Sequence, residues 1–175
     1  MRIVFLGPPG AGKGTQADII SKRYGIRKIS TGDILRNEME NNTELGKLAK
    51  EYVKKGELVP DEIMVKIIEN NIKNLESFIL DGFPRTINQA IELDKITHID
   101  KVIHIKVPDE EIKRRLINRG RIDDKLDVIE NRIKVYREQT QPLIEYYKNK
   151  GILYEVEGVG SIEEITKRIE STLKS

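Results

Sequence analysis

The 175-residue chain contains no cysteine. Disulfide bonds, thiolate chemistry and a cysteine-ligated zinc site are therefore excluded, and we expect no zinc. No run of apolar residues approaches the length of a membrane span. The formal net charge is only +2, which gives no strongly basic field of the kind that attracts nucleic acids. We therefore expect neither a membrane nor a nucleic acid as partner.

The N-terminal run MRIVFLG is too short for the apolar region of a signal peptide and shows no cleavage site. A cytoplasmic location is the expectation. Hydrophobic residues make up 38% of the chain and charged residues 34%, which is typical of a globular protein. The length favours one domain, residues 1–175, with one core.

Short β-rich runs alternate with helical patterns along the chain. The runs are RIVFL (2–6), IRKIS (26–30), SFIL (77–80), KVIHIKV (101–107) and ILYEV (152–156), and helices are predicted over 13–24, 33–40, 61–74, 86–94, 109–119, 124–149 and 161–173. This alternation predicts an α/β fold, a three-layer sandwich with a central five-stranded parallel sheet. Because ligands bind at the carboxyl ends of such strands, the turns after the runs are the candidate site.

The turn after the first run reads GPPGAGKGT, residues 7–15. Its glycines allow a tight turn whose N–H groups bind phosphate oxygens, and the helix that follows points its positive end at the same place. We expect a triphosphate to contact this loop; the residues are Gly10, Ala11, Gly12, Lys13, Gly14 and Thr15. The usual pattern has Ser or Thr after the lysine as a Mg²⁺ ligand. Gly14 stands there instead, so the metal needs another anchor.

Asp81 is the candidate anchor, because it directly follows the apolar run SFIL. An acid at that strand end would face the phosphate loop, and Mg²⁺ needs only one or two carboxylates beside phosphate oxygens and water. We expect Asp81 to hold Mg²⁺ mostly through water. The alternative is an ordinary turn aspartate before Gly82.

Several segments together resemble the nucleoside monophosphate kinases, and most closely the adenylate kinases. They are GPPGAGKGTQ, STGDILR, GELVPDE, DGFPRT with a later glutamine, RIDD and VYREQTQPLIEYY. The resemblance implies a P-loop kinase that uses Mg²⁺ to catalyse ATP + AMP = 2 ADP. Uridylate–cytidylate kinases usually have Ala at the position of Thr31 and Asn after FPR, so Thr31, Thr86 and Gln89 favour AMP.

The resemblance also implies an AMP site. Nearly fifty residues without a strand pattern separate IRKIS from SFIL and suggest three short helices around GELVP. Within them, residues 31–60 match the family's AMP-binding flap; a plain helical crossover is the alternative. Arg36 and Arg85 suit bidentate phosphate binding, and Gln89 suits the adenine edge. Thr31 also suits a helix N-cap. The implied AMP-binding residues are Thr31, Gly32, Arg36, Leu58, Val59, Gly82, Arg85 and Gln89.

Arginines gather in KRRLINRGRIDD, residues 113–124. Arg115 and Arg119 are four residues apart on a predicted helix and share one face. The resemblance implies that Arg115 stacks on the ATP adenine and that Arg119, Arg121 and Arg132 contact phosphates. Lys13, Arg85, Arg119, Arg121 and Arg132 are the expected catalytic residues. A solvated charged face or an incidental RNA-binding patch is the alternative.

The chain departs from the family pattern at the lid over ATP. Only Gly120 separates Arg119 from Arg121, so a vestigial lid remains at residues 119–122. We expect weaker ATP binding and more reaction with water than in relatives with a lid. A monomer is expected. Two other functions stay open: a kinase of CMP or UMP, and a nucleotide-binding regulatory module with weakened catalysis.

Overall fold

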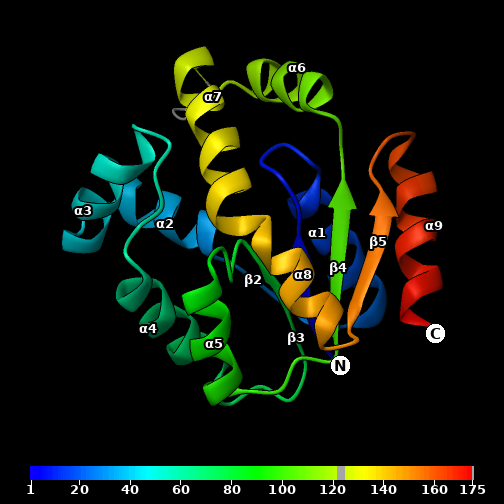
Figure 1. Ribbon diagram of the computed structural model, residues 1–175. Coiled ribbons are helices and arrows are strands. Elements are labelled where there is room, and N and C mark those ends of the chain that lie inside the picture. Colours follow the sequence, from blue (N-terminus) through cyan, green and yellow to red (C-terminus); the bar gives the residue numbers. More distant parts are fainter. Residues whose placement is uncertain (122–124, 175) are drawn as a thin grey trace.

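The computed structural model describes residues 1–121 and 125–174 (Figure 1). Within them, five parallel strands form one sheet in the order β2-β3-β1-β4-β5. The strands are β1 (Arg2–Leu6), β2 (Arg27–Ser30), β3 (Phe78–Asp81), β4 (Lys101–Lys106) and β5 (Leu153–Glu157). The predicted α/β fold with a five-stranded parallel sheet is confirmed, and each strand lies within one residue of its predicted start.

The helices follow the predicted pattern with one exception. They are α1 (Lys13–Tyr24), α2 (Thr31–Glu40), α3 (Glu44–Val53), α4 (Asp61–Ile72), α5 (Ile87–Ile96), α6 (Asp109–Arg119), α7 (Leu126–Val135), α8 (Pro142–Asn149) and α9 (Ile162–Leu173). The single helix predicted over 124–149 is wrong. Residue 124 lies outside the described residues, and a π-helical segment, η1 (Tyr136–Thr140), separates α7 from α8.

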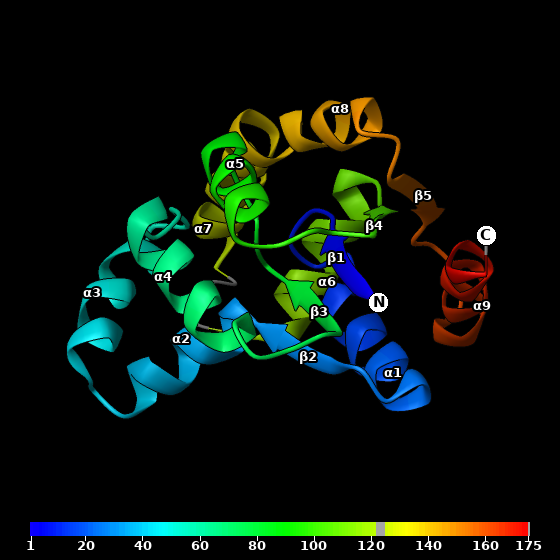
Figure 2. The same cartoon turned by 90° about the horizontal axis from the view of Figure 1, so that it is seen from below.

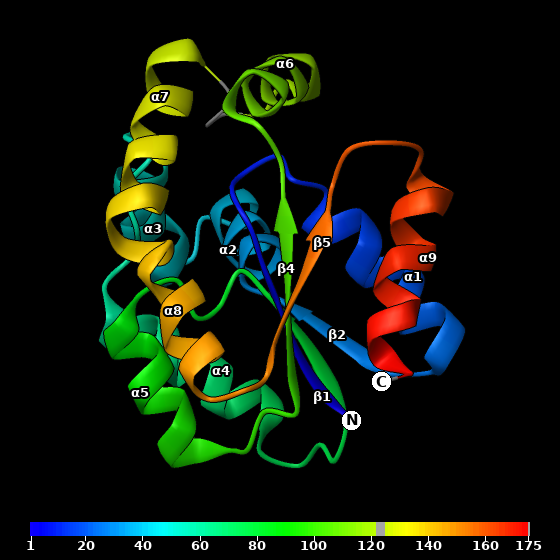
Figure 3. The same ribbon diagram turned by 45° about the vertical axis from the view of Figure 1, so that its right-hand side comes forward.

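Side chains of the strands alternate between two cores. Val4 and Leu6 face one cluster, which α4, α5 and α8 cover, while Ile3 and Phe5 face the other, which α1 and α9 cover. Figures 2 and 3 show these two helical layers on opposite faces of the sheet. Strands buried on both faces need apolar residues at every position, which explains the continuous apolar runs.

The carboxyl ends of the three neighbouring strands β2, β3 and β1 lie in one row. Ser30 pairs with Asp81 and Asp81 pairs with Phe5 across the sheet. The phosphate loop leaves β1 and α2 leaves β2 at this edge, while α6 and α7 lie beyond it (Figure 1). The sheet therefore brings together the segments that the sequence marks as functional. No helix in the described part of the chain has the length and apolar character needed to cross a membrane.

Helices α2 and α3 approach each other closely at Gly46. A Cβ atom on Gly46 would lie 2.0 Å from the backbone oxygen of Glu38 in α2, so only glycine fits. The backbone N–H of Gly46 also donates the N-capping hydrogen bond to the side-chain oxygen of Thr43 at 3.0 Å. This one position sets how tightly the two helices pack.

Replacing Gly46 with alanine should therefore destabilise the protein. Glycine to alanine inside a helix normally stabilises by about 0.5–1 kcal/mol, but overpacking here should cost about 1–3 kcal/mol. Urea unfolding measures the change, with Lys47→Ala, an exposed position of the same helix, as control. An unfolding midpoint equal to or above that of the wild type would contradict the close packing.

Candidate active site

The phosphate loop has the backbone that its glycines predict. Gly10 and Gly12 have φ values of 77° and 91°, in the left-handed region that favours glycine. A Cβ on Gly10 would also lie 2.9 Å from Leu116 of α6. Helix α1 begins directly after Gly12, at Lys13, so its N-terminus opens toward the loop. Free N–H groups and the helix dipole at this point favour an anion.

A cavity of about 430 Å³ lies above the carboxyl ends of β1, β2 and β3. Of the residues expected to contact substrates or metal, those that line it are Gly10, Gly12, Lys13, Gly14, Thr15, Thr31, Gly32, Arg36, Leu58, Val59, Asp81, Gly82, Arg85, Gln89, Arg115, Arg119, Arg121 and Arg132. Ala11 does not line it; its side chain is buried in the core next to α1. The predicted residues of both substrate sites therefore share one cavity.

Lys13 carries a strongly perturbed charge in this cavity. Burial in the loop lowers its pKa to about 8, and the nearby Arg85, Arg132 and Arg119 lower it as well, while the carboxylate of Asp81 raises it. Its ammonium group contacts the backbone oxygen of Pro8 at 3.4 Å. Burial and the neighbouring cations both disfavour the charged form of Lys13, and a bound phosphate would favour it.

Asp81 ends β3 with only 8% of its surface exposed. Its Oδ2 lies 3.6 Å from the point where a Cβ on Gly14 would stand. A hydroxyl after Lys13 would therefore project toward this carboxylate. The short Gly14 leaves that space open, and the hard oxygen of Asp81 faces it, which suits Mg²⁺ and its water. Thr15 lies on the same loop and is exposed.

Thr31 ties α2 to the turn after β3. Its hydroxyl donates to the backbone oxygen of Gly82 at 3.0 Å. A Cβ on Gly82, whose φ is 89°, would lie 2.4 Å from that hydroxyl. The N-cap of α2 is Ser30, whose side chain accepts from the N–H of Asp33 at 3.2 Å. The N-cap interpretation of Thr31 is therefore wrong by one residue.

Arg36 points across the first turn of α2. Its guanidinium pairs with Asp33 and lies 3.1 Å from the Cβ position of Gly32. Partial burial of Asp33 would raise its pKa, but the hydrogen bond and charge of Arg36, with Lys28 and Arg121, lower it overall. Arg121 follows α6 in the sequence, yet its charge acts on the start of α2. The arginines of the two predicted substrate sites therefore lie close enough to share one electrostatic environment.

Arg85 and Gln89 are held firmly at the start of α5. The Nε of Arg85 donates to the oxygen of Gly82 at 2.9 Å, and its backbone N–H donates to Oε1 of Gln89 at 2.6 Å. Thr140 of η1 donates to the backbone oxygen of Arg85 at 2.6 Å. Thr140 is a contact that the sequence analysis missed, because nothing in the motif spacing connects the two residues.

Arg115 of α6 contacts the backbone of the phosphate loop. Its guanidinium donates to the backbone oxygens of Gly10 and Ala11, each at 3.4 Å, and to that of Gly158 after β5 at 2.9 Å. Arg119, four residues later, lines the same cavity, so the two residues share a face as predicted. The sequence thus found Arg115 but not its contact with the loop.

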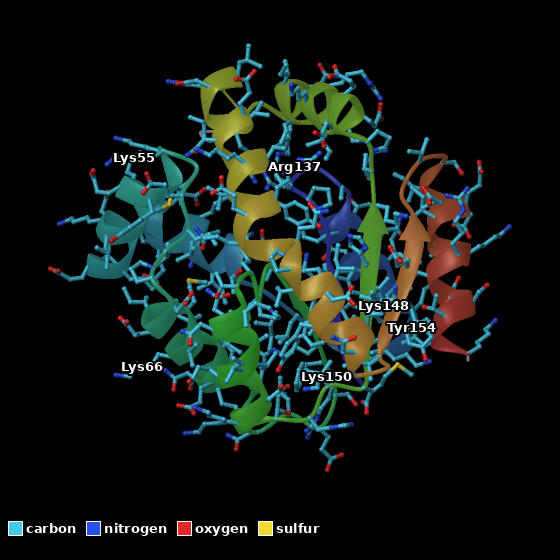
Figure 4. All side chains as sticks on the ribbon, in the orientation of Figure 1. Lys55, Lys66, Arg137, Lys148, Lys150 and Tyr154 are labelled. Atoms are coloured by element: carbon cyan, nitrogen blue, oxygen red, sulfur yellow. The ribbon has the colours of Figure 1, made fainter. Side chains whose placement is uncertain are left out.

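Helices α6 and α7 meet through a small apolar cluster of Ile112, Leu116, Ile129 and Ile133. Leu126, at the start of α7, is exposed, whereas Val128 is buried. Arg137 of η1 pairs with Asp109 at the start of α6 (Figure 4). These contacts hold Arg132 of α7 over the cavity. Of the vestigial lid, Ile122 lies outside the described residues, while Gly120 ends α6 with a φ of 71°.

A phosphate loop with its lysine, at the open edge of a parallel sheet and opposite an arginine-lined cavity, defines a P-loop nucleotide kinase. The family model described as adenylate kinase matches residues 5–152. The chain belongs to the adenylate kinase family.

Curated relatives cover nearly the whole chain. The chain is 48% identical over 180 residues to the adenylate kinase of Leptospira biflexa, covering 96% of this chain and 97% of the relative. It is 49% identical over 178 residues to that of Prochlorococcus marinus, covering 98% of each. For that of Archaeoglobus fulgidus, identity is 43% over 213 positions, covering 99% and 98%. Since this chain has only 175 residues, at least 38 positions of that alignment have no counterpart in it.

The buried charge of Lys13 predicts that Lys13→Met stabilises the ligand-free protein. The folded-state pKa of about 8 lies below the ordinary value of 10.5, so the folded state bears the full cost of the charge below pH 8. This cost disappears as pH rises toward 10.5, where the unfolded state also loses its proton. Urea unfolding should show a more stable variant at pH 7 and a smaller difference at pH 10.

Lys22→Met, an exposed position on the same helix, is the control for removing a lysine. A Lys13→Met variant less stable than the wild type at pH 7 would contradict the electrostatic interpretation. So would a difference that does not change with pH.

Proposed function

We propose that the cavity of this adenylate kinase binds ATP at the phosphate loop and AMP between α2 and α5, and transfers the γ-phosphoryl group directly between them. The observation that carries the proposal is that a single cavity unites Lys13 of the loop with Arg36, Arg85 and Gln89. Two phosphate-binding groups on opposite sides of one space are what a kinase of nucleoside monophosphates requires.

On the ATP side, the N–H groups from Gly10 to Thr15 bind the β- and γ-phosphates together with Lys13. Arg115 already holds the loop through its backbone oxygens. The face of its planar guanidinium stays suited to stacking on the adenine of ATP. Arg119 and Arg132 supply positive charge from α6 and α7.

On the AMP side, Arg36 and Arg85 bind the α-phosphate, whose oxygen attacks ATP. Thr31, Gly32 and Gly82 shape the turn beside it. Gln89, Leu58 and Val59 form the end that receives the base. Residues 31–60 act as the flap over AMP in this proposal; α2 and α3, which form most of it, lie at the margin of the sheet in Figure 1.

Transfer needs no general base, because the attacking oxygen of AMP is already anionic. The protein positions the two phosphates in line and neutralises the charge of the transferred group. Lys13, Arg85, Arg119, Arg121 and Arg132 surround the reacting atoms and serve this role. Burial and the nearby arginines lower the pKa of Lys13, and the negative charge of bound phosphates would favour its charged form.

Mg²⁺ fits the space between Gly14 and Asp81, since the Asp81 carboxylate faces it and no side chain at position 14 blocks it. Bound Mg²⁺ supplies positive charge to the β- and γ-phosphate oxygens. Asp81 holds it mostly through water. Its position beside β1 and β2 keeps that carboxylate fixed relative to the loop.

The active unit in this proposal is a monomer. Rates of ADP formation from ATP with AMP, CMP, UMP and GMP test the function directly. We expect a strong preference for AMP. Equal rates with CMP or UMP would favour a pyrimidine monophosphate kinase. Absence of transfer, with retained binding, would favour a regulatory module.

Phosphate release from ATP without acceptor, compared with a relative that has a lid, tests the vestigial lid.

The metal role of Asp81 predicts the behaviour of Asp81→Asn. The change preserves shape, so folding and AMP binding should persist. Metal affinity or activity should fall roughly 10- to 100-fold, as for other carboxylates that bind a metal through water. Initial rates titrated with Mg²⁺ measure this. Glu92→Gln, an acid of α5 paired with Lys95, is the control. An unchanged Mg²⁺ dependence in Asp81→Asn would mean that another group, such as Thr15, holds the metal.

A further inference from the structure

Asp61, the first residue of α4, accepts hydrogen bonds from three side chains at the start of α5. Its Oδ1 accepts from Thr86 at 3.1 Å and from Nε2 of Gln89 at 2.9 Å. Its Oδ2 accepts from Asn88 at 3.0 Å. Asp61 does not line the main cavity, so its link to the site runs through Gln89.

The Gln89 amide is held between two partners that each allow only one orientation. Gln89 is only 2% exposed. A carboxylate is acceptor-only, so the end of the amide that meets Asp61 must be the NH₂ group. The backbone N–H of Arg85 is donor-only, so the other end, at 2.6 Å, must be the oxygen. The polarity of this amide is therefore set by chemistry on both sides.

The remaining capacity of Gln89 is one N–H and one lone pair on Oε1. Adenine offers an amino donor beside a ring-nitrogen acceptor, which matches an amide with fixed polarity. A 6-oxo purine has a carbonyl acceptor where adenine has the amino donor, so it would meet the wrong end of the amide. An amide free to flip could pair with either base.

We propose that Asp61 is a specificity-determining positioning residue: together with the backbone N–H of Arg85, it fixes the polarity of the Gln89 amide, so that the site selects a 6-amino purine monophosphate over a 6-oxo purine monophosphate. This inference rests on the proposed base-reading role of Gln89. The Asp61 carboxylate does not touch the substrate in this proposal. It acts by orienting the Gln89 side chain, which does touch it.

The test compares AMP with inosine monophosphate as acceptors, using kcat/KM for each. In Asp61→Asn the new NH₂ group can face the Gln89 amide, so one of the two partners that hold its orientation is lost and only the backbone N–H of Arg85 remains. The AMP-to-inosine-monophosphate ratio should then fall, by about tenfold, since one misplaced buried polar contact typically costs about 1–3 kcal/mol. KM for ATP should stay unchanged. Glu62→Gln, the neighbouring acid in the first turn of α4, is the matched control and should keep the ratio.

A merely structural tie between α4 and α5 gives a different result. Loss of that tie would lower both efficiencies together and leave the ratio unchanged, which would overturn the proposal. If Asp61→Asn does not fold, Asp61→Ser poses the same question, because its hydroxyl both donates and accepts. An unchanged ratio in a folded Asp61→Ser would equally overturn it.

Gln89→Ala separates this inference from the function on which it rests. If Gln89→Ala leaves the ratio unchanged, the base-reading role of Gln89 is wrong, and the proposal for Asp61 is overturned with it. If Gln89→Ala lowers the ratio but Asp61→Asn does not, only the role of Asp61 fails. If both lower it, Asp61→Asn in the Gln89→Ala background should add no further change. A further fall would show that Asp61 acts on the base by another route.

Discussion

The pairing of β2, β3 and β1 in one parallel register is the constraint on which the site depends. It places Ser30, Asp81 and Phe5 side by side at one edge of the sheet. Their relative positions are thus fixed: Ser30 caps α2, Asp81 faces the phosphate loop and Phe5 lies in the strand that leads into that loop. A shift of one residue in β3 would turn Asp81 to the opposite face of the sheet. The apolar residues of β3, all buried, prevent such a shift.

The cavity gathers positively charged side chains. Burial lowers the pKa of Lys13 most; among the described residues, Arg85, Arg132 and Arg119 lower it further, and the carboxylate of Asp81 raises it. Charge stabilisation that is arranged before the substrate arrives costs no rearrangement during the reaction.

The sequence predicted the features that depend on local pattern. Glycines with positive φ, apolar runs and the position of Asp81 at a strand end all follow from near neighbours in the chain. What it missed depends on distant contacts. Ser30 rather than Thr31 caps α2, because the Thr31 hydroxyl is used by Gly82, 51 residues away. The π-helical segment η1 places Thr140 at Arg85, and no periodicity in 124–149 reveals that need. Likewise, nothing in the local sequence around Asp61 indicates its hydrogen bonds with Thr86, Asn88 and Gln89, which lie 25 to 28 residues away.

Gly120, the C-cap of α6, marks a position at which the chain could be lengthened. Apart from its chain neighbours and the nearby helix backbone, a Cβ on Gly120 would meet no atom of the described residues within 4 Å, and Gly120 is exposed beyond the cluster that joins α6 to α7. Chain added at this junction would extend into solvent without repacking either core. The junction is therefore a suitable insertion site for engineering. A lid segment over the nucleotide could be lengthened there without changing the sheet, the phosphate loop or the surroundings of Gln89.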